Sequence, residues 1–205
     1  MPRPRSLTTR QLAAAALTVI DRDGLPALSM RTVAAELDRR TMALYRYVED
    51  RAELECLVVD LALGTVLDQA ARTTPPAAAR PVPPRERLLE LLQLMREAVG
   101  AHPGVLPLVV RHHGGCLPAL RWREWLLEAL AAAGLDGPHR SAALHALVSY
   151  VIGALELEHR PAEDRAGLAA PDAFPLLAAA LPGAADPRQV YLDGARAVLD
   201  GLRIA

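Results

Sequence analysis

Two short helical patterns joined by a tight turn, within residues 29–47 (SMRTVAAELDRRTMALYRY), constrain the fold of this chain most. Ser29 is a good N-cap for the first pattern, and Val33, Ala34 and Leu37 give it a small apolar face. Helices of about seven residues are unstable alone in water, so they need further helices to close a core. The pattern predicts a helix-turn-helix, whose second helix enters a DNA major groove.

The second helix of this unit follows the charged run at residues 38–40, and Thr41 is its expected cap. Met42, Leu44 and Tyr45 are predicted to begin its inner side. Its outer side then carries Arg40, Thr41, Ala43, Arg46 and Tyr47.

Neighbouring sequence supplies the helices that the unit needs. The apolar stripe of residues 12–20 predicts a helix over 9–23 that ends at Gly24, and a long helix is expected over 51–71. The strings D-x-x-G-L-x-x-L-S-M-R, L-Y-R-Y-V and D-R-A-E-L, read in this order between Leu12 and Leu57, resemble the N-terminal domain of the tetracycline-repressor (TetR) family of bacterial transcriptional regulators.

The resemblance implies DNA contacts from the cap of the first short helix, the outer side of the second and the start of the long helix. Arg31 and Arg40 suit bidentate pairing with guanine, whereas the hydroxyl groups and Arg51 suit phosphate. The alternative is an ordinary solvated helical face. The candidate DNA-binding residues are Ser29, Arg31, Arg40, Thr41, Ala43, Tyr45, Arg46, Tyr47 and Arg51.

The turn departs from the family pattern, which usually has glycine and then an apolar residue where this chain has Asp38 and Arg39. Aspartate tolerates a left-handed backbone, but Arg39 must extend to solvent or the turn must change shape. This departure keeps an alternative open: a helical ligand-binding or protein-interaction module that has lost DNA binding.

Composition favours an all-α fold. The 205 residues are 52% apolar but only 3% aromatic, and alanine and leucine dominate. Residues 1–51 hold nine arginines against six acidic residues, and the rest of the chain holds 14 against 18. We therefore expect a basic three-helix head at 1–52, joined by a long helix to an acidic helical body at 53–205.

The chain is expected to be cytoplasmic and to have no membrane partner. Cys56 and Cys116 suggest free thiols in a reducing compartment, and the charged residues 21–23 argue against a signal peptide. No run reaches the roughly 18 apolar residues needed to cross a membrane. His145 interrupts the best candidate, residues 142–155.

The body is predicted to consist of helices separated by proline- and glycine-rich segments. Residues 73–84 and 160–172 read as loops. The expected helices cover residues 85–101, 105–111, 117–133, 141–158, 174–181 and 187–202.

The resemblance also implies a homodimer, with the helices at 141–158 and 187–203 forming a four-helix interface. A twofold pair of heads reads two half-sites of a palindrome, whereas one short helix reads few base pairs. The candidate interface residues are Leu144, Leu147, Val148, Val151, Ile152, Leu155, Gly194, Ala195 and Val198.

A pocket for a small-molecule effector is expected in the body, where polar and aromatic residues lie on apolar helices. Each of them is individually more typical of a core or surface position. The candidates are His102, Arg111, Trp122, Trp125, His145, Ser149, Tyr150 and Glu156. No cofactor is expected.

Enzyme sites are poorly supported. His112, His113 and Cys116 lack a fourth metal ligand and read as a surface loop, so no metal is expected. His145 and Ser149 have no placed carboxylate and no G-x-S-x-G motif, which disfavours a small helical hydrolase. The sequence predicts a ligand-responsive repressor that binds a palindromic operator as a homodimer.

Overall fold

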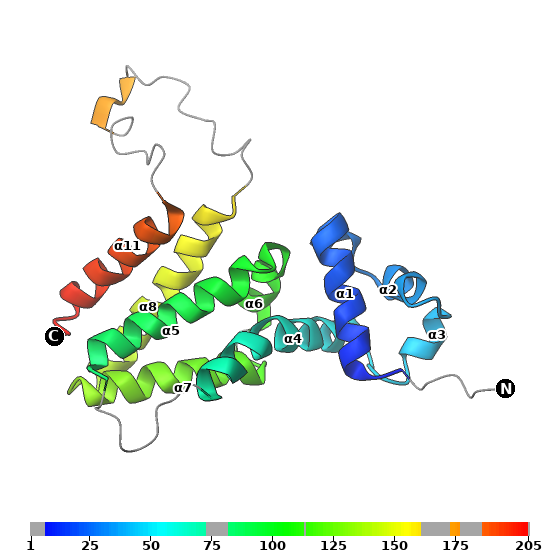
Figure 1. Cartoon of the computed structure of the whole chain (residues 1–205), viewed down its shortest axis with the longest axis horizontal. Helices are drawn as coiled ribbons and strands as arrows, with labels where there is room; N and C mark the ends of the chain where they lie inside the picture. Colours follow the sequence, from blue (N-terminus) through cyan, green and yellow to red (C-terminus); the bar gives the residue numbers. More distant parts are fainter. Residues whose placement is uncertain (1–6, 73–81, 113, 161–172, 177–185, 205) are drawn as a thin grey trace.

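The structure is a computed structural model that describes residues 7–72, 82–112, 114–160, 173–176 and 186–204 (Figure 1). Within these ranges every regular element is a helix, which confirms the all-α prediction. The two expected loops lie almost wholly outside the described residues, as does most of the helix expected at 174–181.

The head, as we call the N-terminal part of the molecule, consists of four elements and the start of a fifth. They are α1 (Thr9–Asp23), η1 (Leu25–Ala27), α2 (Met30–Glu36), α3 (Thr41–Leu44) and α4 (Arg51–Arg72).

Local signals at both ends explain why α1 matches its predicted bounds. Thr8 and Gln11 form a capping box, in which the Gln11 backbone N–H donates to Thr8 Oγ1 at 3.2 Å. At the other end Gly24 has φ 81°, and its N–H donates to Ile20 O at 2.9 Å. The helix is therefore closed at each end by its own sequence.

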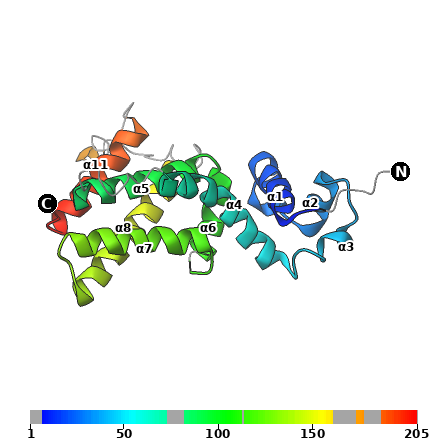
Figure 2. The same cartoon turned by 60° about the horizontal axis from the view of Figure 1, so that its bottom comes forward.

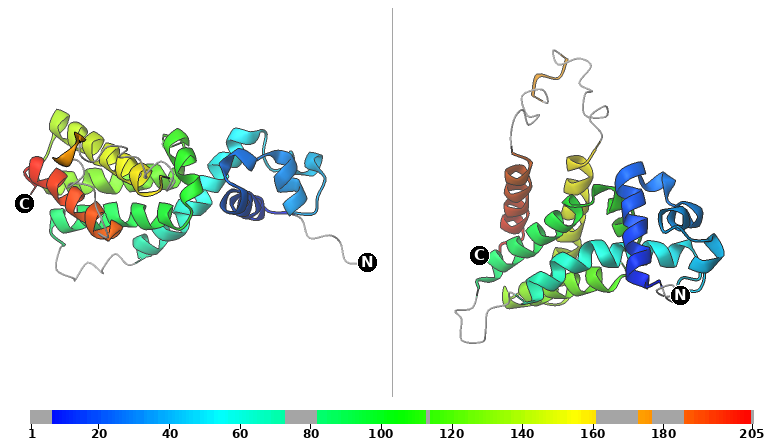
Figure 3. Two further views of the ribbon diagram at one scale, coloured as in Figure 1. Left: turned by 90° about the horizontal axis from the view of Figure 1, so that it is seen from above. Right: turned by 45° about the vertical axis from the view of Figure 1, so that its right-hand side comes forward.

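The remaining helices form the body. They are α5 (Pro84–Gly100), η2 (Pro103–Val105), α6 (Leu106–His112), α7 (Leu117–Ala132), α8 (Gly137–Glu158) and α11 (Pro187–Gly201). Figures 2 and 3 show α4 running out of the head and along the body, where it contacts α5, α6 and α7. Because α4 also packs on α1, this single helix is shared by the head and the body.

Two boundaries differ from the prediction. α8 begins at Gly137, four residues before the expected cap Ser141, because Asp136 is extended and Pro138 fits a first helical turn that needs no N–H donor. The helix expected at 105–111 is preceded by the 3₁₀ turn η2 and continues to His112.

Hydrogen bonds to carbonyl groups of α5 fix the other body helices around it. Trp122 is buried, and its Nε1 donates to Leu91 O at 2.8 Å. Tyr191 on α11 is buried as well, and its hydroxyl donates to Leu92 O at 2.9 Å. These bonds satisfy polar groups that burial would otherwise penalise.

α8 is long and apolar enough to cross a membrane by length and composition, contrary to the expectation that no segment would be. Only 22% of its most apolar 18-residue window is buried within the chain. One such helix is weak evidence for a membrane, but the exposed apolar surface needs an explanation.

Candidate nucleic-acid interface

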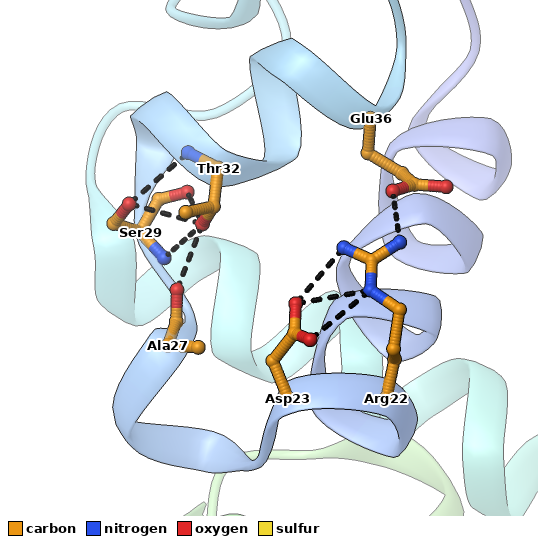
Figure 4. A network of polar contacts seen from close by, with 6 residues as sticks. All are labelled: Arg22, Asp23, Ala27, Ser29, Thr32 and Glu36. Carbon is orange, nitrogen blue, oxygen red and sulfur yellow. Dashed lines mark hydrogen bonds and ion pairs between the residues drawn. The ribbon is translucent and has the colours of Figure 1, made fainter.

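The N-terminus of α2 is held by a compact capping network (Figure 4). The Thr32 backbone N–H donates to Ser29 Oγ at 3.1 Å, and the Ser29 N–H donates to Thr32 Oγ1 at 2.9 Å. Thr32 Oγ1 also donates to Ala27 O at 2.8 Å, which ties the helix to η1. The Ser29 hydroxyl is therefore used mainly to fix α2, rather than left free for a phosphate.

An ion pair joins α1 and α2. Arg22 Nη1 lies 2.9 Å from Glu36 Oε2, and Arg22 Nη2 lies 2.9 Å from Asp23 Oδ2 (Figure 4). These groups are largely exposed, so the pair contributes little to stability.

The unusual turn after α2 has regular geometry. The Arg39 N–H donates to Ala34 O at 2.9 Å and the Asp38 N–H donates to Ala35 O at 3.1 Å, which is the hydrogen-bond pattern of a Schellman motif. Asp38 takes the left-handed position with φ 51°. Arg39 is exposed. The charged pair thus completes the turn, and its arginine extends into solvent.

α3 is only one turn long, which corrects three details of the prediction. The N-cap is Arg40 rather than Thr41. Met42, expected on the inner side, is 75% exposed, and Tyr45 is 46% exposed. Leu44 is fully buried and anchors α3, whereas Tyr47, expected on the outer side, packs against the core.

Arginine side chains dominate the exposed surface around α2, the turn and α3. Arg31, Arg40 and Arg46 are exposed and form no ion pair with any described residue. Ser29, Thr41, Ala43 and Tyr47 are half-buried. The head therefore presents uncompensated positive charge beside hydroxyl and apolar groups, as a DNA-reading surface requires.

Arg51 differs from the other candidates because it is already paired. Its Nε lies 2.8 Å from Glu55 Oε1 on the same helix, and Glu55 is only 2% exposed. Glu55 Oε2 also accepts hydrogen bonds from Arg111 and His112 of α6, each at 2.9 Å. Burial raises the pKa of Glu55, but bonds from His112, Arg51 and Arg111 outweigh it and leave the pKa lowered.

Sequence reasoning missed Arg39, Met42 and Glu55. Met42 was assigned to the inner side because the second helix was expected to be longer than one turn, whereas Arg39 was expected to extend to solvent or to reshape the turn. An Arg51–Glu55 pair at i, i+4 is visible in sequence, but its connection to α6 is not.

The chain matches no family model. It is 33% identical over 175 residues to the HTH-type transcriptional repressor DrrR1 of Streptomyces coeruleorubidus, covering 82% of this chain and 60% of that protein. The chain thus spans about 60% of the length of the curated relatives it matches.

Solved structures of transcriptional regulators match the fold of this chain over nearly its whole length. A possible TetR family transcriptional regulator from Streptomyces coelicolor A3(2) superposes with a TM-score of 0.81 at 27% identity, covering 95% of this chain and 98% of that one. The chain thus shares the fold of TetR-family regulators. A structure titled as BioQ with its double-stranded DNA operator has a TM-score of 0.68 at 25% identity, with coverage of 97% and 99%.

Several of the candidate effector residues form contacts with different elements. His102 pairs with Asp21 of α1 at 2.8 Å, and Arg111 with Glu55. The Tyr150 hydroxyl donates to Tyr191 O, and the Trp122 indole N–H donates to Leu91 O of α5. Trp125 is half-buried, and His145, Ser149 and Glu156 are exposed. Effector binding by any of these eight residues stays a prediction.

A different pocket is present, which we call the α4–α7 pocket. It is open on one side and has a volume of about 270 Å³. Its lining residues are Asp60, Gly64, Asp68, Leu117, Pro118 and Arg121. None of these residues was a candidate from the sequence. An acidic residue on an amphipathic helix is normally predicted to face solvent, and only the structure shows that α7 lies beside α4 here.

Several predicted dimer-interface residues belong to the chain's own core. Leu147, Val151, Leu155 and Ala195 are buried against α5 and neighbouring helices. Gly194 admits Tyr150 of the same chain, since a Cβ there would lie 2.5 Å from the tyrosine hydroxyl. The residues that keep exposed surface are Leu144, Val148, Ile152 and Val198.

The histidine–cysteine segment is only in part the surface loop that was expected, since Gly114 and Gly115 form an exposed turn. His113 lies outside the described residues, but His112 ends α6, with Nδ1 3.5 Å from Cys56 Sγ. Cys116 is 1% exposed, and burial raises the pKa of its thiol to about 12, which makes it unreactive. Among the described residues no group of three or more histidine, cysteine or acidic side chains could hold a metal ion.

Proposed function

We propose that the chain is a cytoplasmic, ligand-responsive transcriptional repressor that binds a palindromic DNA operator as a homodimer. The observation that carries the proposal is the exposed, uncompensated arginine surface on a regular helix-turn-helix. Residues 1–52 form the DNA-binding domain and 53–205 the ligand-binding and dimerisation domain, with α4 connecting them. The relatives that match are named as transcriptional regulators rather than enzymes, which supports this assignment.

DNA binding is supported by the geometry of the turn. A distorted turn would have favoured a module that had lost DNA binding, but Asp38 and Arg39 complete a Schellman motif. BioQ, which shares the fold, was crystallised with its operator. The same orientation of α3 in this chain would place Arg40, Thr41 and Tyr45 toward a major groove.

The dimer is supported by the exposed apolar surface of α8. Leu157 is 62% exposed, and Ile152 is half-exposed on the same helix. A second copy related by a twofold axis would cover this surface and hold the two heads at a fixed spacing, about 34–36 Å for successive major grooves. An effector that prefers a different spacing would release the operator.

The test is binding to the duplex that flanks the chain's own gene, measured by fluorescence anisotropy at two salt concentrations. Arg31→Ala combined with Arg40→Ala should weaken binding by roughly thirtyfold or more, because two arginines that each contribute about 1–3 kcal/mol of base discrimination together contribute at least about 2 kcal/mol. Thermal unfolding should hardly change, since neither side chain has an ion-pair partner among the described residues.

Arg188→Ala is the matched control, because Arg188 is an exposed arginine at the start of α11, far along the chain from the head. It should leave DNA affinity unchanged. Equal affinity for the flanking duplex and a random duplex of the same length, lost together as salt rises, would contradict the proposal. Such a result would favour the alternative, a helical ligand-binding or protein-interaction module that has lost DNA binding.

A further inference from the structure

Asp60 is the most unusual residue of the α4–α7 pocket. Its Oδ1 atom is buried and has no hydrogen-bond partner among the described residues. A buried carboxylate oxygen without a donor keeps its desolvation penalty. Burial accordingly raises the pKa of this carboxyl group. The site would be stabilised by any partner that supplies a donor or a positive charge.

The charges around the pocket leave Asp60 uncompensated. Arg121 Nη1 lies 3.5 Å from Asp68 Oδ1, and both side chains are about half exposed. Arg121 is thus paired with Asp68 rather than with Asp60, and this contact is long and exposed to solvent. With two aspartates and one arginine lining it, the pocket holds an excess of one negative charge.

Apolar surface adjoins these charges. Leu117 is 62% exposed at the start of α7 and lines the pocket beside Pro118. On the opposite side Gly64 offers no side chain, and nothing lies within 4 Å of the position its Cβ would take. The pocket therefore combines an anionic group with an apolar wall and free space, the usual composition of a small-molecule site.

We propose that the α4–α7 pocket binds an effector carrying a protonated amine next to an apolar group, with the amine against Asp60 and the apolar group against Leu117. This inference deepens the proposed function, on which it rests, by giving the effector a chemical class. It also locates the binding event on α4, the helix that enters the head.

Three probes that share a dansyl group on a five-carbon chain and differ in their end group test the proposal by fluorescence anisotropy on the purified full chain. They are dansylcadaverine, a cation; its N-acetyl derivative, which is neutral; and dansyl-aminohexanoate, an anion. The cation should bind roughly tenfold more tightly than the neutral probe, because a charge-assisted hydrogen bond contributes about 1.5 kcal/mol or more. Asp60→Asn should abolish that preference.

Two further variants keep the result interpretable. Glu124→Gln removes an exposed carboxylate from α7 outside the pocket and should retain the preference for the cation. Gly64→Met fills the open space and should weaken binding of all three probes, while thermal unfolding confirms that each variant folds. This second route tests the pocket even if Asp60→Asn fails to fold.

Equal affinity for the three probes, tighter binding of the anion, or a cation preference that survives in Asp60→Asn would each overturn the site. Anisotropy with the flanking duplex, run on the same protein, separates this outcome from failure of the proposed function. DNA binding without cation preference refutes the amine site alone. Cation preference without DNA binding keeps the site and refutes the regulator.

Discussion

The left-handed residue at the end of α2 shows how one side chain can replace the glycine that the family usually has there. Asp38 has φ 51°, and the two backbone hydrogen bonds of the Schellman motif form around it. Aspartate is among the few side chains that adopt this conformation at modest cost. Arg203 has φ 56° in the same motif after α11, where its N–H donates to Asp200 O and that of Ile204 to Leu199 O.

Replacing Asp38 therefore has consequences that depend on backbone preference rather than on charge. Asp38→Gly should leave the thermal midpoint close to that of the parent, whereas Asp38→Val should lower stability by about 1–2 kcal/mol, because a β-branched residue resists a positive φ. Asp136→Val is the control, since Asp136 is extended at φ −135° and its side chain caps nothing. If Asp38→Val unfolds at the parent temperature, the turn must adopt another conformation.

At the scale of elements, the contact between α1 and η2 joins the head to the body. Gly104 lies so close to α1 that a Cβ there would be 2.8 Å from Ile20 Cγ2. Beside it, His102 Nδ1 lies 2.8 Å from Asp21 Oδ2. Glu55 makes a second connection nearby by accepting hydrogen bonds from Arg51 and from α6. A shift of α6 or η2 would therefore reach the head directly.

Gly104→Ala should disturb this junction while leaving the helices intact. Ile20 is a buried, branched side chain that cannot move away easily, so the added methyl group should separate η2 from α1. We expect a loss of about 1–3 kcal/mol in stability and weaker binding to the flanking duplex.

The control for this junction is Gly100→Ala, because nothing lies within 4 Å of its Cβ position in α5. That change should be neutral or slightly stabilising, as alanine is favoured over glycine in a helix. Equal effects of the two substitutions in thermal unfolding and anisotropy would show that the junction is not tightly packed.

At the scale of the whole molecule, α8 and α11 pack on the body and leave apolar surface uncovered. The buried side of α8 carries Ala143, Leu147, Val151 and Leu155, spaced four residues apart. Ile152 and Leu157 lie off this stripe; Leu157 is exposed and Ile152 is partly exposed. Surface of this kind on a helix otherwise built into a core is typical of an interface between copies.

Ile152→Glu should convert the proposed dimer to a monomer without unfolding it, because a charge in an apolar interface loses its hydration without gaining a partner. Light scattering coupled to size exclusion should report the monomer mass, and affinity for the flanking duplex should fall because the two heads are no longer linked. Leu120→Glu, on an exposed position of α7, is the control. A parent that is already monomeric, or a variant that stays dimeric, would exclude this surface as the interface.

Much of the secondary structure could be predicted because its signals lie within a few residues of one another. Thr8 with Gln11, Ser29 with Thr32, and Gly24 define helix ends through bonds that span at most four positions. Apolar spacing likewise separates a buried side from an exposed one within each helix. The all-α fold and the resemblance of the head to the TetR family follow from such local patterns.

Tertiary structure alone decided which of these surfaces meet. Periodicity marks Leu147 and Ile152 equally as apolar, yet the chain's own core buries the first and leaves the second partly exposed. Glu55 connects to α6 across 56 residues, and Asp60 lines a pocket only because α7 lies beside α4. Local hydrogen bonds are encoded by neighbours in sequence, whereas burial and unpaired charge depend on the packing of distant helices, which no single segment specifies.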